Sequence, residues 1–189
     1  MKNTINFQAL TEYAKSFSGL TDGHEEVLAS VKDEIFQRIP NITDAFYAKL
    51  ITIEKTKPFL EGRIEQLKKT HSKWLESLFS SAFDSHYTEA MYKVGDVHVK
   101  INLPVEFMAG SMTLLSNLII SEIETLTLDS TKKAELTNAV ISAIGFCLLI
   151  MQQSYQTSFL QRELEPFLKM TGISETLFSN LSSAYTPSN

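Results

Sequence analysis

Apolar residues recur at spacings of three and four along most of this chain, and they never alternate with polar residues over a sustained stretch. That period is typical of amphipathic helices, whereas a half-buried strand would show a period of two. Only 7 glycines and 5 prolines interrupt the 189 residues, so breaks between helices are few. The pattern therefore predicts an all-α protein of about seven helices.

Capping residues and prolines set the expected boundaries in the first half of the chain. A short helical segment at 7–17 precedes a helix of about five turns that begins at Asp22. Asp22 and Glu25 have the spacing of a capping box, and Pro40 is expected to end this helix. A shorter helix with its own apolar stripe follows at 41–51.

Longer helices are expected in the second half. After a broken region, residues 63–83 carry apolar side chains on one side and lysines on the other, as a core-facing helix does. A helix at 85–101 follows, and Pro104 is placed to begin the next one. Asp129 is expected to cap a long closing helix over 130–160.

Helix-breaking residues near the carboxyl end predict a linker. Pro166 and Gly172 are expected to break the helix there, and the last residues have a linker composition. We therefore expect an amino-terminal helical extension at 1–20, one main domain at 21–163 and a linker at 164–189.

The last two long helices, which start near Pro104 and Ser130, are apolar over more than one face. A helix that is hydrophobic most of the way round needs cover on more than one side, and a domain of this size covers only one. The sequence therefore predicts a homodimer that packs through these two helices.

Composition and charge narrow the class of protein. The formal net charge of −5, without a basic cluster, argues against a nucleic-acid partner. The apolar run at 139–151 is shorter than the roughly 20 residues of a membrane span, and the amino terminus lacks a secretory signal. The single cysteine, Cys147, permits no disulfide within the chain and favours the cytoplasm.

His98 is the clearest candidate for a functional residue in this sequence. Met91, Val94, His98 and Ile101 are spaced three, four and three apart, so His98 shares the inward face of its helix with Val94. A lone histidine on such a face is more often a satisfied core residue than a ligand. A helical histidine just before a proline-initiated helix, among about seven helices, is nevertheless typical of the globin architecture.

The segment "FDSHYTEAMYKVGDVHVKINLPVEF", residues 83–107, carries a resemblance to a known family. It resembles the globin domain of the bacterial globin-coupled sensors, relatives of the protoglobins, and the likeness extends over roughly residues 20–160. The shared pattern is Phe-Asp, a Tyr three residues on, Val-Gly, a His three beyond the Gly, then Ile, Leu and Pro. The resemblance implies a globin fold with an extra amino-terminal helix and a carboxy-terminal linker helix. It also implies haem b (iron protoporphyrin IX), with His98 as the proximal ligand and sole metal-binding residue.

Two upstream segments extend the resemblance. "ITDAFYAKL" is similar to the family segment whose tyrosine reaches over the distal side, which makes Tyr47 the expected donor to a bound gas. "EQLKKTHSKWL" is similar to the distal helix, in which Leu67 would gate access and Thr70 would be the small, hydrogen-bonding residue. His71 is expected to be a surface or shielding histidine, with ligation of the iron by two histidines as the alternative.

Four further residues are expected to line the cofactor, although each is also an ordinary core residue of a helical domain: Phe46, Phe59, Trp74 and Val94. The chain departs from the family at two places. The family commonly has Gly where this chain has Asn102, and Asn also tolerates a left-handed backbone. The family has a Trp-Tyr pair where this chain has Phe107 and Met108, which removes a polar aromatic group near the proximal side.

The resemblance implies a sensor of O2, with CO and NO as further ligands. Such a domain regulates an output domain, for example a diguanylate cyclase or a chemotaxis transducer, and is not itself an enzyme. One alternative is a haem-free globin-like scaffold that signals through protein contacts. Another is an enzyme that uses the haem as a peroxidase or nitric oxide dioxygenase, which ranks last because no reductase segment accompanies the globin-like part.

Overall fold

Helices make up most of the described structure. The structure is a computed structural model that describes residues 5–174, 176–178 and 180–181. No strand occurs among those residues, so the predicted all-α class is confirmed. Where the spacing predicted about seven helices, these residues form the following elements: α1 (Phe7–Ser18), α2 (Asp22–Ser30), α3 (Lys32–Phe36), α4 (Ile39–Ile51), the 3-10 helix η1 (Glu54–Thr56), α5 (Lys57–Leu60), α6 (Ile64–Leu78), α7 (Ser85–Lys100), α8 (Val105–Glu124) and α9 (Ser130–Thr171).

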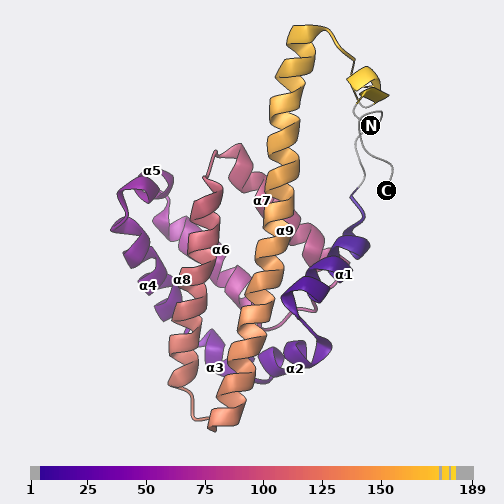
Figure 1. The fold of residues 1–189 in the computed structure, drawn as a ribbon. Coiled ribbons are helices and arrows are strands. Elements are labelled where there is room, and N and C mark those ends of the chain that lie inside the picture. Colours follow the sequence, from indigo (N-terminus) through magenta and orange to yellow (C-terminus); the bar gives the residue numbers. More distant parts are fainter. Residues whose placement is uncertain (1–4, 175, 179, 182–189) are drawn as a thin grey trace.

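The domain is built around α9. α8 runs beside α9 in the opposite direction, and α1, α2 and α7 also pack against it (Figure 1). α4 joins the remaining helices, because it contacts both α6 and α8. The fully buried positions of α9 recur at helical spacing: Ala139, Val140, Ala143, Phe146, Cys147 and Ile150. Since a large buried apolar side chain contributes about 1.5–3 kcal/mol, this face supplies much of the domain's hydrophobic stabilisation.

Two of the three boundary predictions for α9 are confirmed and one is wrong. Asp129 caps the helix as predicted, with its carboxylate accepting the amide of Lys132. The predicted break at Pro166 is wrong, because the helix continues to Thr171. Proline removes the hydrogen bond that its own amide would donate, and its ring crowds the carbonyl four residues before it, but the helix absorbs both effects here. The neighbouring residues are largely exposed, so water can satisfy the carbonyl that is left over. Gly172, with a φ of 69°, ends the helix as predicted.

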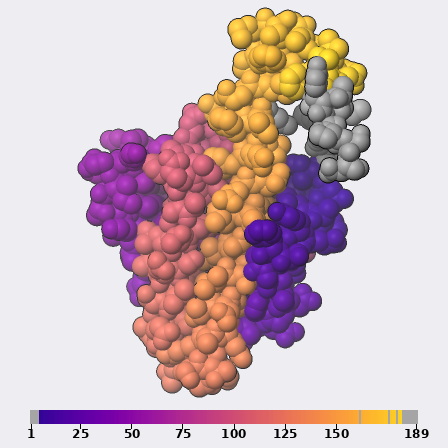
Figure 2. Space-filling model, viewed as in Figure 1, coloured from indigo at the N-terminus to yellow at the C-terminus, as the bar shows by residue number. Residues whose placement is uncertain are grey.

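The carboxy-terminal part of α9 projects beyond the rest of the domain (Figure 2). The expected boundary between residues 163 and 164 therefore falls inside a continuous helix. Residues 182–189 of the expected linker lie outside the described residues. The division into extension, main domain and linker stays a prediction.

Residues 21–40 form more than the single helix that was predicted. α2 is capped by the hydroxyl of Thr21, so the capping box expected to begin at Asp22 is wrong. The chain leaves helical geometry at Val31, where φ is −118° and ψ is 14°. Pro40 lies in the first turn of α4, where no amide hydrogen is required. This proline therefore belongs to the start of a helix and not to the end of one.

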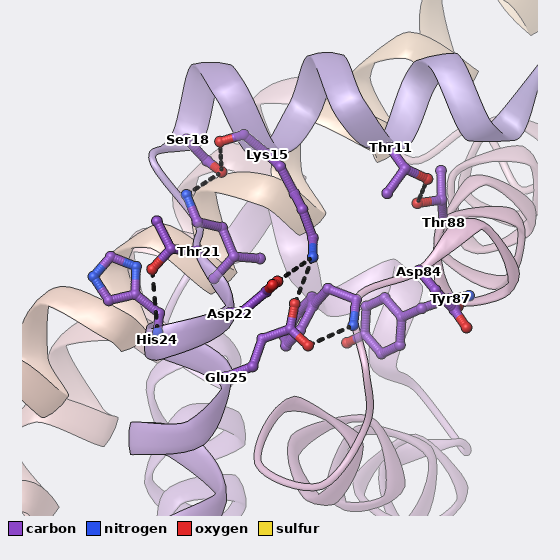
Figure 3. A network of polar contacts seen from close by, with 12 residues as sticks. Thr11, Lys15, Ser18, Thr21, Asp22, His24, Glu25, Asp84, Tyr87 and Thr88 are labelled. Atoms are coloured by element: carbon purple, nitrogen blue, oxygen red, sulfur yellow. Dashed lines mark hydrogen bonds and ion pairs between the residues drawn. The ribbon is translucent and has the colours of Figure 1, made fainter.

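Polar contacts tie α1 to its neighbours (Figure 3). Lys15 forms an ion pair with Glu25 of α2 at 2.6 Å. The second carboxylate oxygen of Glu25 accepts the backbone amide of Phe83 at 3.3 Å. The hydroxyls of Thr11 and Thr88 lie 2.6 Å apart in a buried position between α1 and α7. The amino-terminal helix is thus packed against the helix that carries His98.

Length and composition alone would allow α9 to cross a membrane, and it is the one helix of the described ranges that passes this test. Half of its most apolar window is buried inside the domain. Four helices, α1, α2, α7 and α8, pack against it. This burial is typical of a core helix, in agreement with the interpretation of residues 139–151 as a buried segment.

Candidate functional site

His98 lies in the last turn of α7 with one ring nitrogen buried and unpaired. Asp84 begins α7 by accepting the amide of Tyr87 at 2.8 Å. In the described part of the chain, Nδ1 of His98 has no hydrogen-bond partner. Burial, and secondly the charge of nearby His71, lowers the pKa of His98 to about 4. The ring is therefore neutral at pH 7, which is the form of imidazole that binds metals.

An open apolar face surrounds His98 on α7. Val94, Val97 and Ile101 lie four residues before, one before and three after His98, and are 38%, 53% and 40% exposed. Because successive helical residues are 100° apart, Val94 and Ile101 lie within about 60° of the histidine around the helix axis, and Val97 lies about 100° away. The shared face predicted for Val94 and His98 is present, but Val94 is exposed and not inward. We call Val94, Val97, His98 and Ile101 the His98 strip. An apolar strip left open beside an unpaired imidazole is suited to an apolar ligand.

The side chains of α6 that lie toward the site are Leu67, His71 and Trp74, each half-buried. They are spaced four and three residues apart and therefore form one face of the helix. Thr70 is exposed, and its hydroxyl donates to the carbonyl of Gln66 at 3.1 Å. Of the two residues that the resemblance places on this helix, Leu67 thus lies on the inner face and Thr70 does not.

Tyr47 of α4 meets His71 at the centre of this region. The tyrosine is 1% exposed, and its hydroxyl oxygen lies 2.5 Å from Nδ1 of His71. Burial raises the pKa of Tyr47 well above its usual value of about 10, so the hydroxyl keeps its proton. The same Nδ1 lies 3.1 Å from the carbonyl oxygen of Leu67. Tyr47 is thus a protonated, buried group that can donate a hydrogen bond.

Of the two expected roles of His71, surface or shielding histidine, its position does not fit the first. It is half-buried because it follows Leu67 by four residues, and burial lowers the pKa of its ring. If Nδ1 carries the proton, it donates to the Leu67 carbonyl and the Tyr47 hydroxyl hydrogen is free. If Nε2 carries the proton, Tyr47 donates to Nδ1. His71 lies near enough to His98 to contribute to the lowered pKa of that ring.

Two pairs of aromatic side chains involve residues that were expected to line the cofactor. Phe46 is 1% exposed and packs edge-on against Tyr47, with ring centroids 5.2 Å apart. Phe59 of α5 is half-buried and packs perpendicular to Phe107 of α8, at 5.9 Å. Phe107 stands where the family has an aromatic residue with a polar group. In this chain the side chain at that position is fully apolar, and it packs against the apolar ring of Phe59. Its neighbour Met108 is buried in the core.

The site offers two imidazoles, those of His98 and His71, and few other ligating groups. Within the described ranges, no three His, Cys, Asp or Glu side chains come together in a way that could hold a metal ion. A metal at His98 would therefore need its remaining ligands from a cofactor. The structure places His98, Tyr47 and Leu67 of the predicted residues in this region. Val97 and the inward position of His71 were not predicted, although helical spacing from Val94 and from Leu67 indicates them.

The sequence and the fold of this chain are similar to those of known proteins. The family model described as Protoglobin matches residues 7–160. Among solved structures, the globin domain of a Geobacter sulfurreducens globin-coupled sensor is 27% identical. It matches with a TM-score of 0.71, over 76% of this chain and 96% of that one.

The globin domain of DosC from E. coli is also similar, in a ferric and a ferrous form, at 18% and 17% identity. Both forms have a TM-score of 0.66, over 77% of this chain and 99% of the other. At that identity the likeness concerns the fold, and it agrees with the predicted globin architecture.

Proposed function

This chain belongs to the Protoglobin family, and from that premise we propose that it is a haem-binding, O2-responsive sensor domain. The observation that supports this most is the His98 strip. It combines a neutral imidazole, an unpaired buried Nδ1 and exposed apolar neighbours, and His71, the hydrogen-bond partner of Tyr47, lies near enough to lower the pKa of His98. These features fit haem b, because a flat apolar ring needs apolar cover and its iron needs one neutral imidazole.

Each part of the site has a separate task in this proposal. His98 holds the iron through one ring nitrogen. When bound, the haem supplies an iron position at which O2, CO or NO can bind. Tyr47 keeps its proton and presents a hydroxyl donor, which favours a ligand that carries partial negative charge. Phe46, with almost no exposure, helps to exclude water from that hydroxyl. A hydroxyl donor stabilises bound O2, which carries partial negative charge, more than bound CO. The resulting selectivity for O2 is what an O2 sensor requires.

Trp74 provides a direct test of haem binding, because it is the only tryptophan in the chain and lies on the site-facing side of α6. Titration of the haem-free protein with haemin should quench its fluorescence and reach a plateau at about one equivalent. Val94→Asp puts a carboxylate into the His98 strip and should weaken haem binding by at least about tenfold, because a charge is costly to cover with an apolar ring.

The matched control is Phe17→Asp, which places the same charge at an exposed apolar position of α1. It should bind haemin like the parent. If both variants and the parent bind equally, the His98 strip is not the haem site. If the parent shows no saturable quenching, the haem-free signalling scaffold becomes the better description.

A second candidate ligand for the iron is His71, and its hydrogen bonds support this role. A histidine that binds a metal commonly anchors its other nitrogen to a backbone carbonyl. Nδ1 of His71 has such an anchor in Leu67, which leaves Nε2 as the free nitrogen. We propose that His71 competes with gases for the iron.

His71→Leu tests this competition. In the reduced haem-loaded parent without gas, the absorption spectrum should be that of six-coordinate iron, and in the variant that of five-coordinate iron. CO should associate faster with the variant by about tenfold or more, in proportion to the share of iron that His71 had occupied. Identical spectra and CO rates in the two proteins would limit His71 to its contact with Tyr47.

We propose that two copies associate through α8 and α9. These helices lie side by side on one face of the molecule (Figure 2). Leu114 and Leu118 of α8 are only partly buried, and Ile141 of α9 is 53% exposed. Apolar side chains left open on two adjacent helices support a self-association face.

We further propose that the domain acts in the cytoplasm on an output domain, such as a diguanylate cyclase or chemotaxis transducer, and does not itself catalyse a reaction. α9 supports a transmitting role, because it runs from the core contacts with α7 to a projecting end at Thr171. The buried, unpaired Cys147 is compatible with a reducing compartment.

A further inference from the structure

α7 and α9 approach each other closely at Gly95, three residues before His98. A Cβ at position 95 would lie 2.7 Å from the Cβ of Ser154 and 2.9 Å from the carbonyl oxygen of Met151. Those distances leave no room for any side chain, so the two helices are in backbone-level contact. The helix that carries His98 is therefore seated directly on α9.

Asp96 fixes the register of that contact. Its Oδ1 accepts the hydroxyl of Ser154 at 2.6 Å and that of Ser158 at 2.7 Å. Both serines belong to α9, four residues apart, and Ser154 is fully buried. Hydrogen bonds to a carboxylate are stronger than those between neutral groups. A sliding movement of α7 along α9 would break both bonds together.

α9 also holds the turn that follows His98. The hydroxyl of Tyr155 donates to the carbonyl of Leu103, and the guanidinium of Arg162 donates to the side-chain carbonyl of Asn102. The amide of Leu103 in turn donates to the carbonyl of His98 at 3.0 Å. The contacts between the two helices form one group, the α7–α9 clasp: Asp96, Asn102 and Leu103 with Ser154, Tyr155, Ser158 and Arg162.

We propose that Asp96 is a positioning residue that couples His98 to α9. Through Ser154 and Ser158 it fixes the last turn of α7, and with it the His98 ring, relative to α9. A movement of His98 then displaces α9 and its projecting end. Conversely, a displacement of α9 relative to α7 moves His98. This coupling rests on the proposed function for its physiological meaning, but the clasp itself is present in the protein without a cofactor.

Hydrogen exchange of the haem-free protein tests the clasp directly. The amides of Ile101, Asn102 and Leu103 bond to carbonyls of α7 and report on the His98 turn. Asp96→Ala should raise their exchange rates roughly tenfold, as expected for the loss of hydrogen bonds to a carboxylate. Asp96→Asn keeps an acceptor oxygen and should restore most of the protection.

Lys100→Ala, at an exposed position of the same helix, is the matched control and should leave these amides unchanged. A merely structural role of Asp96 predicts a different result, in which α2 and α4 lose protection to the same extent as the His98 turn. That uniform loss, or unchanged exchange at 101–103, would overturn the proposal.

The haem-loaded protein tests the coupling. In the parent, CO should change exchange in residues 152–162 of α9, and in Asp96→Ala this change should fall by at least about fivefold, the lower range of allosteric coupling. A CO response of equal size in both proteins would also overturn the proposal. A parent that takes up no haem would contradict the proposed function, while the haem-free experiment would still decide on the clasp.

Discussion

His98→Ala should abolish stable haem binding. Haem affinity should fall by more than about 100-fold, because loss of a mere supporting contact to a metal-binding histidine already costs roughly 10–100-fold. The fold should survive, since the half-buried ring leaves no hydrogen-bond partner behind in the described residues. Haem content of the purified protein and its helical circular dichroism measure the two effects separately.

His86→Ala is the matched control, because His86 is an exposed histidine on the same helix. It should retain haem like the parent. Free imidazole should partly restore haem binding to His98→Ala by filling the place of the missing ring. Normal haem content in His98→Ala, with an unchanged spectrum, would refute the assignment of the proximal ligand.

Tyr47→Phe should speed the dissociation of O2 by roughly tenfold to a hundredfold. A hydrogen bond to a charged partner contributes about 1.5–3 kcal/mol, and each 1.4 kcal/mol is a factor of ten. CO accepts hydrogen bonds poorly by comparison, so its dissociation should change much less. The stability cost should be small, because Nδ1 of His71 keeps its contact with the carbonyl of Leu67.

Stopped-flow displacement of O2 and of CO measures both rates on the same samples. Tyr13→Phe is the control, because Tyr13 is a 55% exposed tyrosine of α1 that has no role in the proposed site. Loss of its hydroxyl should leave both rates unaltered. Equal O2 dissociation rates for Tyr47→Phe and the parent would remove Tyr47 from the mechanism. An equal acceleration for O2 and CO would indicate a change in access instead of a lost donor.

The helices of the second half of the chain could be predicted well because local signals and packing agree there. Asp129 is a carboxylate at the start of a long apolar run, and it caps α9 as the sequence indicates. Residues 21–40 were harder. The bend at Val31 carries no glycine or proline, and Val31 is only 6% exposed, so packing and not local sequence determines it. Pro166 shows the reverse case, in which a strong local breaker is tolerated inside a helix.

The site could be predicted as far as helical periodicity reaches. Spacing alone put Val94 and His98 on one face, and the resemblance singled out Tyr47 as the donor. The contact between Tyr47 and His71 joins α4 to α6 across 24 residues, so no local pattern could show it. The clasp between Asp96 and α9 spans more than 50 residues and was equally hidden.

Haem binding through His98 is tested most directly by the absorption spectrum of the protein, expressed with a supply of haem. It should be recorded in the ferric state, after reduction with dithionite, and after addition of CO. If the protein binds haem through His98, a Soret band should correspond to about one haem per chain and should shift with CO. A protein without a Soret band, even after reconstitution with haemin, would contradict it and leave His98 without a role as an iron ligand.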